Sequence, residues 1–312
     1  MALAMVFPGQ GSQSQGMQAD LASDFTEVGE TYAEASEVLG YDLWQLVTDG
    51  PAERLAETTI TQPAMLTAGF AAWRVWLKAG GSAPAQLSGH SLGEYTALVC
   101  GGALSFADAM RVVQRRAQLM QDAVPVGAGA MAAIIGLDDA AVIDVCGEAA
   151  GDGVAEAVNF NAPGQVVIAG DAEAVDRAVV IASDRGARRA LKLPVSVPAH
   201  SRLMREAGEA LQEALAAAEI TRPEIPVVAA SNAEAYVDGD DIRTRLSAQV
   251  YAPVQWVATI QAMAAAGADT VIECGPGKVL AGLVRRIDKS LQTGTLDSPA
   301  GLEKALALTT AE

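Results

Sequence analysis

Residues 87–97 read LSGHSLGEYTA, and this stretch decides the fold class because residues 89–93 form a Gly-x-Ser-x-Gly motif. The spacing is typical of a serine nucleophile on a sharp turn between a strand and a helix, where the glycines permit close packing. We expect Ser91 to lie at the N-terminus of that helix, whose amides help to hold an oxyanion. The motif leaves the acceptor open: water in a hydrolase, another thiol or alcohol in a transferase.

The chain on both sides of the motif alternates short apolar runs with helical patterns. Residues 3–7 and 270–273 predict strands, whereas residues 62–79 and 106–124 predict helices. This alternation indicates an α/β fold with a mainly parallel sheet. The tail after Lys289 is polar, and we expect it to be peripheral.

The middle of the chain has a different pattern. From residue 129 to residue 197 the predicted order is β-α-β-β-α-β, which is the ferredoxin-like arrangement, with a last strand at 189–197. A segment of this size is large enough for a minimal domain. We therefore predict a large α/β domain formed by 1–126 and 198–312, with a ferredoxin-like small subdomain at 127–197 inserted into it.

Composition excludes several classes of function. Asp and Glu number 38 against 21 Lys and Arg, and the net charge of −17 disfavours general binding to nucleic acid or to an anionic membrane. The three cysteines are widely spaced, which favours a reduced, cytoplasmic setting over a disulfide framework. We expect no membrane span, no signal peptide and no metal site, because the sequence lacks the corresponding patterns.

A serine nucleophile needs a base, and the chain contains two histidines. His90 adjoins Ser91, and neighbouring side chains at a sharp turn usually diverge. His200 follows the return of the small subdomain to the large domain, which is a common place for a site. No Asp or Glu is marked as a third member, so we expect a Ser91–His200 pair held by a backbone carbonyl or an amide side chain.

Two further features have open interpretations. The glycine-rich loop at 9–14 lacks the sixth-position Gly or Ala of a dinucleotide-binding turn, and its backbone amides suit an oxyanion hole. Three arginines, Arg111, Arg115 and Arg116, lie on the helix at 106–124. One that faces the serine would bind a substrate carboxylate, and the pattern does not choose among them.

Seven ordered blocks together resemble the malonyl-CoA:acyl carrier protein transacylases of fatty acid synthesis. They are FPGQGSQ (7–13), GHSLGEYTALV (89–99), GAMAAIIGL (129–137), VNFNAPGQVVIAG (158–170), LPVSVPAH (193–200), YAPVQW (251–256) and GPGKVL (275–280). The resemblance covers nearly the whole chain. It implies a hydrolase-like domain with a ferredoxin-like insert, and ping-pong transfer of a malonyl group from malonyl-CoA to the phosphopantetheine thiol of acyl carrier protein, without a cofactor.

The resemblance also implies roles for individual residues. Ser91 is malonylated and His200 is its general base and acid. The backbone amides of Gln10 and Leu92 form the oxyanion hole, and Arg116 pairs with the malonyl carboxylate. The backbone carbonyl of Gln249 orients His200. The side chains of Asn161 and Met120 line the pocket. Two other classes compete with this interpretation: a serine thioesterase or esterase, and a catalytically silent carrier-binding scaffold.

Overall fold

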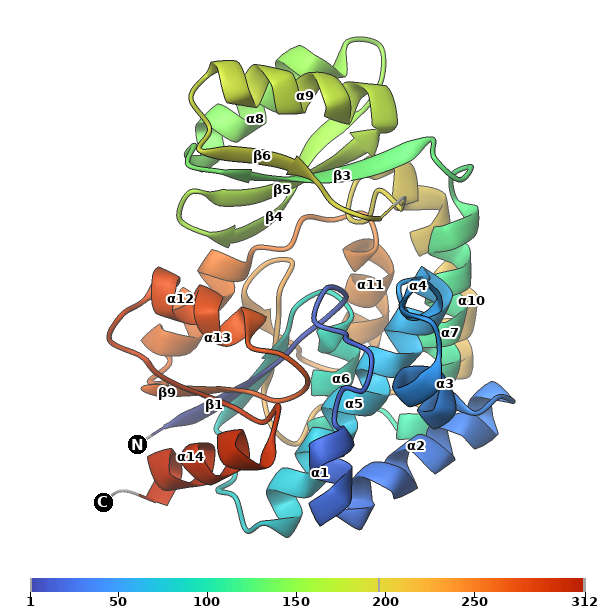
Figure 1. Cartoon of the computed structure of the whole chain (residues 1–312), viewed down its shortest axis with the longest axis vertical. Helices are drawn as coiled ribbons and strands as arrows, with labels where there is room; N and C mark the ends of the chain where they lie inside the picture. Colours follow the sequence, from blue (N-terminus) through green and yellow to red (C-terminus); the bar gives the residue numbers. More distant parts are fainter. Residues whose placement is uncertain (1, 196, 311–312) are drawn as a thin grey trace.

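The structure is a computed structural model that describes residues 2–195 and 197–310, and these form two sheets (Figure 1). The larger sheet has the strand order β10-β9-β1-β2-β7-β8. Its strands are β1 (Leu3–Phe7), β2 (Gln86–Gly89), β7 (Val227–Ala229), β8 (Glu234–Ala235), β9 (Thr270–Glu273) and β10 (Gln292–Thr295). Every neighbouring pair is parallel except β7 with β8. The predicted mainly parallel α/β fold is confirmed.

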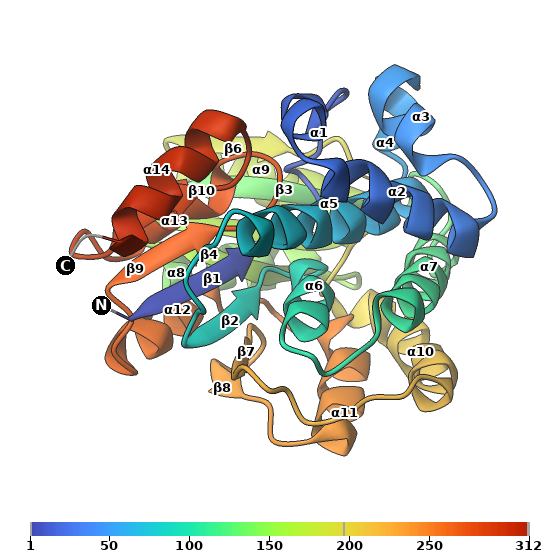
Figure 2. The same ribbon diagram turned by 90° about the horizontal axis from the view of Figure 1, so that it is seen from below.

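Helices cover both faces of this sheet (Figure 2), because alternate side chains of the buried strands point in opposite directions. Met5 and Phe7 of β1 belong to a large core, whereas Ala4 and Val6 belong to a smaller one with α12 (Trp256–Ala265) and α13 (Val279–Ile287). The helices of the large core are α1 (Ala19–Asp24), α2 (Thr26–Leu39), α3 (Leu43–Asp49), α4 (Ala52–Leu55), α5 (Thr58–Lys78), α6 (Gly93–Cys100), α7 (Phe106–Asp122), α10 (Arg205–Ala217), α11 (Gly239–Gln249) and α14 (Pro299–Thr310).

The smaller sheet is wholly antiparallel and has the order β4-β5-β3-β6. Its elements are β3 (Gly129–Ile135), α8 (Asp139–Ala150), β4 (Ala155–Ala162), β5 (Gln165–Asp171), α9 (Ala172–Asp184) and β6 (Arg189–Lys192). Helices α8 and α9 cover the face that points away from the larger sheet (Figure 1). This is the ferredoxin-like arrangement, and its elements lie inside the predicted range 127–197, whose limits remain a prediction.

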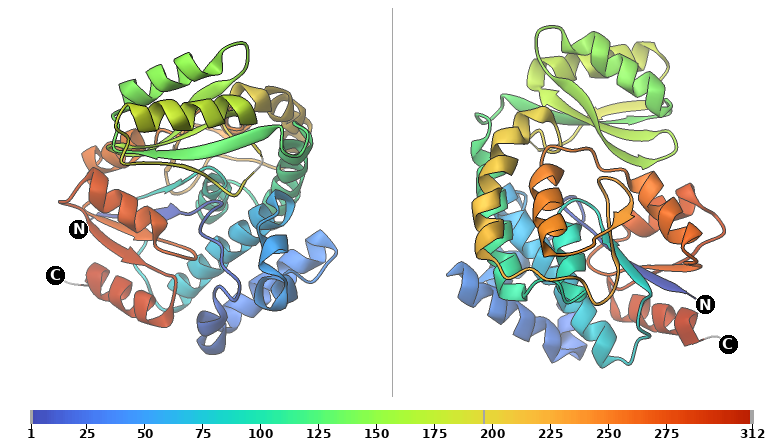
Figure 3. Two further views of the ribbon diagram at one scale, coloured as in Figure 1. Left: turned by 45° about the horizontal axis from the view of Figure 1, so that its top comes forward. Right: turned by 180° about the vertical axis from the view of Figure 1, so that it is seen from behind.

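The small subdomain is fastened to the large domain along β4. Phe160 donates its N–H to the carbonyl of Val254 at 2.9 Å, and Val254 donates to the carbonyl of Val158 at 2.8 Å. Arg286 of α13 also donates to the carbonyl of Pro163 at 3.3 Å. The opposite edge strand, β6, leads through residues 193–199 back to His200, before the short helix η1 (Arg202–Met204). The face of the small sheet without helices therefore overlies the large domain (Figure 3).

Two expectations were wrong. The last strand of the insert ends at Lys192 instead of residue 197, because Pro194 has no N–H for a ladder and Val195 turns back onto the carbonyl of Leu193 at 2.8 Å. Position 196 of that predicted strand lies outside the described residues. The tail after Lys289 is not peripheral: β10 pairs with β9, and α14 covers it with Leu302 and Ala305 buried.

Candidate active site

The sharp turn after β2 holds Ser91 in a left-handed conformation, with φ of 53°, which non-glycine residues adopt only under constraint. Glycine is required on both sides. A Cβ on Gly89 would lie 2.0 Å from the backbone of Gly93, and a Cβ on Gly93 would lie 1.9 Å from the carbonyl of Phe7. The close packing of α6 on β1 and β2 therefore forces the turn and presents the hydroxyl of Ser91 at the start of α6.

His200 lies beside this hydroxyl. Its Nε2 is 2.7 Å from Ser91 Oγ, and its Nδ1 is 2.8 Å from the carbonyl of Gln249 and 3.1 Å from that of Ala252. Because both partners of Nδ1 are carbonyls that only accept, Nδ1 carries the proton and Nε2 is free to accept one. The arrangement is a serine–histidine pair oriented by backbone carbonyls, and no carboxylate of the described residues hydrogen-bonds the imidazole.

His200 is 3% exposed, and its environment opposes a positive charge. Burial lowers the pKa of His200 to about 3, with a further lowering from the nearby charge of Arg116, while the carbonyl of Gln249 acts in the opposite direction. The imidazole is therefore neutral, and able to act as a base, across the whole physiological range.

We expect the rate of Ser91 acylation by an uncharged donor, such as acetyl-pantetheine, to stay flat as pH falls from 8 to well below 6.5, the ordinary pKa of histidine. The reason is that the proton acceptor loses its function only when pH approaches the lowered pKa of His200. Single-turnover acylation followed by intact mass measures this profile. An acid limb centred near 6.5 would contradict it.

The orientation of helix α7 shows which of the three arginines can face Ser91. Ser105 caps its N-terminus by accepting from the N–H of Asp108 at 3.1 Å. Arg116 lies on the buried face of the helix with Val113 and Met120, at helical spacing, whereas Arg111 and Arg115 are exposed. Figure 3 shows α7 lying beside α10.

The guanidinium of Arg116 reaches three oxygens. Nη1 donates to Gln62 Oε1 at 2.6 Å, and Nη2 donates to Gln249 Oε1 at 3.1 Å and to Ser91 Oγ at 3.3 Å. Its Nε has no partner among the described residues, although the side chain is 1% exposed. A buried cation with spare donors next to the nucleophile is suited to accept a substrate carboxylate.

A cavity of about 340 Å³ opens onto these groups, a size usual for small-ligand sites. Gln10 and Leu92 line it, and within the described chain the N–H of neither residue donates to another protein group. A Cβ on Gly9 would lie only 2.5 Å from the carbonyl oxygen of His90. The loop after β1 therefore packs directly on the turn that holds Ser91. Both amides are therefore available to an oxyanion.

The remaining predicted residues have specific partners. His90 donates from Nε2 to Asn161 Oδ1 at 2.8 Å, which joins the turn to β4 of the small subdomain. Met120 accepts from Gln62 Nε2 at 3.5 Å through its sulfur. Asn161 and Met120 both line the cavity, whereas Gln249 lies behind it. Burial lowers the pKa of His90, and its hydrogen bond with Asn161 opposes this shift.

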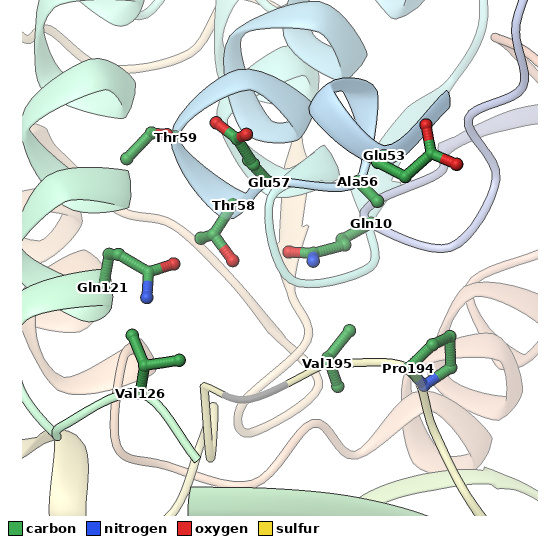
Figure 4. Close-up of a pocket in the computed structure, with 10 residues that line it drawn as sticks. All are labelled: Gln10, Glu53, Ala56, Glu57, Thr58, Thr59, Gln121, Val126, Pro194 and Val195. Atoms are coloured by element: carbon green, nitrogen blue, oxygen red, sulfur yellow. The ribbon is translucent and has the colours of Figure 1, made fainter. Parts of the chain in front are cut away.

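A second hollow of about 410 Å³ adjoins the first and shares Gln10, Ala56, Pro194 and Val195 with it (Figure 4). Glu53 and Glu57 come to it from α4 and the loop before α5, and no Lys or Arg lines it. This side of the site therefore disfavours the phosphates of an anionic substrate.

In the described chain we find no cluster of three metal-binding side chains. None of its described helices has the length and apolar character to span a membrane.

Sequence reasoning missed Gln62, which lines the cavity, and three groups behind the cavity: Glu94, Tyr236 and the side-chain amide of Gln249. They lie in four elements or loops and meet only in the folded chain. Gln62 had a local signal, because it directly precedes the mostly apolar run of α5 at residues 63–73.

The chain matches the acyl transferase domain family over residues 4–302. It is 53% identical over 305 residues to a malonyl CoA-acyl carrier protein transacylase of Escherichia coli strain K12, covering 98% of this chain and 99% of the relative. A crystal structure of a malonyl-CoA:acyl carrier protein transacylase from Xanthomonas oryzae pv. oryzae matches with a TM-score of 0.97 and 52% identity, covering 100% of both chains. A malonyl-transacylase solved in complex with its type II PKS acyl-carrier protein has a TM-score of 0.97 and 49% identity, covering 99% of this chain and 100% of that chain. With this coverage, identity and shared fold, the chain belongs to the acyl transferase family, in its group of malonyl CoA-acyl carrier protein transacylases.

Proposed function

We propose that this protein transfers the malonyl group of malonyl-CoA to the phosphopantetheine thiol of an acyl carrier protein in fatty acid biosynthesis. The observation that carries the proposal is the distance of 3.3 Å between Arg116 Nη2 and Ser91 Oγ. It places a cation that can bind a substrate carboxylate directly beside the nucleophile. The names of the relatives support it: each is a transacylase of malonyl CoA and acyl carrier protein. The solved complex of a relative with its carrier supports the choice of partner.

In the first half-reaction Ser91 Oγ attacks the thioester carbon of malonyl-CoA while its proton passes to His200 Nε2. The carbonyl oxygen becomes an oxyanion held by the amides of Gln10 and Leu92. The intermediate collapses, the carbon–sulfur bond breaks, and the CoA thiol takes the proton from His200. The malonyl carboxylate pairs with Arg116 throughout, which positions the carbon for attack.

In the second half-reaction the carrier's phosphopantetheine thiol gives its proton to His200 and attacks the ester carbon of malonyl-Ser91. Collapse breaks the carbon–oxygen bond, and Ser91 recovers its proton from His200. Donor and product are both thioesters, so the overall transfer needs no external energy source. We propose that the enzyme needs no cofactor of its own, since phosphopantetheine arrives on the carrier.

The cellular setting is also a proposal. Cys100, Cys146 and Cys274 are all buried free thiols, and free thiols persist in a reducing compartment. We therefore propose a cytoplasmic location. Partial oxidation of these thiols in protein isolated from its native source under thiol-blocking conditions would contradict this location.

The test of the proposed function is to follow the acyl group. We expect malonyl-CoA to add one malonyl group to Ser91, seen by intact mass and peptide mapping, and holo carrier protein to remove it. Carrier without phosphopantetheine is the control and should leave the adduct in place. Equal loss of the adduct with and without carrier would indicate a thioesterase, and no adduct would indicate a scaffold. Parallel assays with fatty acid and polyketide carriers test the proposed pathway.

A further inference from the structure

A buried carboxylate that the reaction does not use lies behind the site. Glu94, the second residue of α6, is 0% exposed. It accepts hydrogen bonds from the hydroxyl of Tyr236, from Gln249 Nε2 at 2.9 Å and from the N–H of Ala230 at 3.4 Å. The pKa of Glu94 is raised, because the effect of burial outweighs the opposite effects of these donors and of the charge of Arg116. Since three donors converge on the two oxygens, the geometry is that of an ionised carboxylate.

Glu94 fixes which way the amide of Gln249 points. Gln249 Nε2 has two acceptors, Glu94 Oε2 and the carbonyl of Ser91, each at 2.9 Å. Its Oε1 must therefore face Arg116, where it accepts from Nη2 at 3.1 Å. The reversed amide would place N–H groups against the guanidinium and oxygen against a carboxylate, so only one orientation is stable.

The link from Glu94 through Gln249 also places a negative charge near Arg116 and leaves the N–H groups of Arg116 free to bind a substrate carboxylate. Among the described residues no carboxylate lies within ion-pair distance of Arg116, although a buried cation requires a nearby negative charge. Glu94 supplies that charge one amide away. Because the amide of Gln249 stands between them, the carboxylate of Glu94 does not occupy the N–H groups that a substrate would use.

We propose that Glu94 and Tyr236 are positioning residues for acyl-group selection: through the side chain of Gln249 they hold Arg116 charged, oriented and open to a substrate carboxylate. This inference rests on the proposed malonyl transfer. It predicts that the network affects a carboxylated acyl group and not the chemistry of acyl transfer itself, since among the described residues the carboxylate of Glu94 makes no hydrogen bond to the hydroxyl of Ser91 or to His200.

The test compares malonyl-CoA with acetyl-CoA in Glu94→Gln, which removes the charge and keeps the shape. Loss of a hydrogen bond network to a charged group should lower kcat/KM for malonyl loading about 10- to 100-fold. Loading of acetyl-CoA should stay within about 3-fold of the starting protein, because that group makes no ionic contact. Tyr236→Phe should show the same selectivity change at a smaller size, and it carries the test if Glu94→Gln does not fold.

Glu273→Gln is the matched control, because Glu273 is also 0% exposed and hydrogen-bonds backbone at the start of α13. It should leave the malonyl-to-acetyl ratio unchanged. Equal losses for both donors in folded Glu94→Gln and Tyr236→Phe would overturn the inference and assign the network a structural role. Failure of the unaltered protein to form malonyl-Ser91 would instead overturn the proposed function, so the two failures are distinguishable.

Discussion

Ser91→Ala and His200→Ala are each expected to lower malonyl transfer by about 10⁴- to 10⁶-fold, the range seen when members of a catalytic serine–histidine pair are removed. Ser91 supplies the atom that bonds to the acyl group, and His200 is the proton acceptor at 2.7 Å from it. Because the two side chains act as one unit, the double replacement should cost about as much as either single one. Steady-state transfer to holo carrier measures all three variants.

Ser88→Ala is the matched control for the nucleophile. Ser88 is buried in β2, and its hydroxyl donates to the carbonyl of Val228 at 2.8 Å. It should retain the covalent malonyl adduct that Ser91→Ala loses. Multiplicative losses in the double variant would show that Ser91 and His200 act independently, and a malonyl adduct on Ser91→Ala would place the nucleophile elsewhere.

The fold was predictable where local pattern and tertiary structure agree. The Gly-x-Ser-x-Gly turn requires glycine at 89 and 93 because backbone atoms of neighbouring elements occupy the space of a Cβ. The β-α-β-β-α-β order of the insert was predictable because its sequence alternates between strand-like and helix-like patterns of apolar residues. By contrast, β10 has the sequence QTGT, and its place at the sheet edge comes only from pairing with β9 and from the cover of α14.

The candidate site was predictable in part for the same reason. Ser91 stands out because it lies in the Gly-x-Ser-x-Gly motif, and His200 stands out because the chain has only two histidines. Arg116 could have been separated from Arg111 and Arg115 by helical spacing, since it shares the apolar face of α7 with Val113 and Met120. Glu94 and Tyr236 have no such signal: they are 142 residues apart and become partners only when α6 contacts β7, which pairs with the strand before Tyr236.

Replacement of Arg116 by alanine is expected to separate acyl selection from catalysis. Removing one partner of a buried, hydrogen-bonded charge pair costs about 2–5 kcal/mol, so malonyl loading should fall roughly 30- to 5,000-fold. The charge of Arg116 also lowers the pKa of His200, and its loss should raise that pKa toward the ordinary value. The base then becomes stronger for any donor, so acetyl loading should be retained or increased. Loading of Ser91 from each CoA ester, measured by rapid quench, gives both rates.

Arg116→Ala also affects the stability of the site, since it leaves Glu94 as an uncompensated buried charge. The single variant should therefore unfold at lower temperature, and adding Glu94→Gln should recover part of the loss without restoring malonyl selection. Arg111→Ala is the control on the same helix, because Arg111 is exposed and pairs with Asp108 at 2.8 Å. Equal losses for malonyl and acetyl loading in a folded Arg116→Ala would remove Arg116 from carboxylate recognition. Selective loss of malonyl loading, with acetyl loading preserved, would identify its charge as the feature that distinguishes the two substrates.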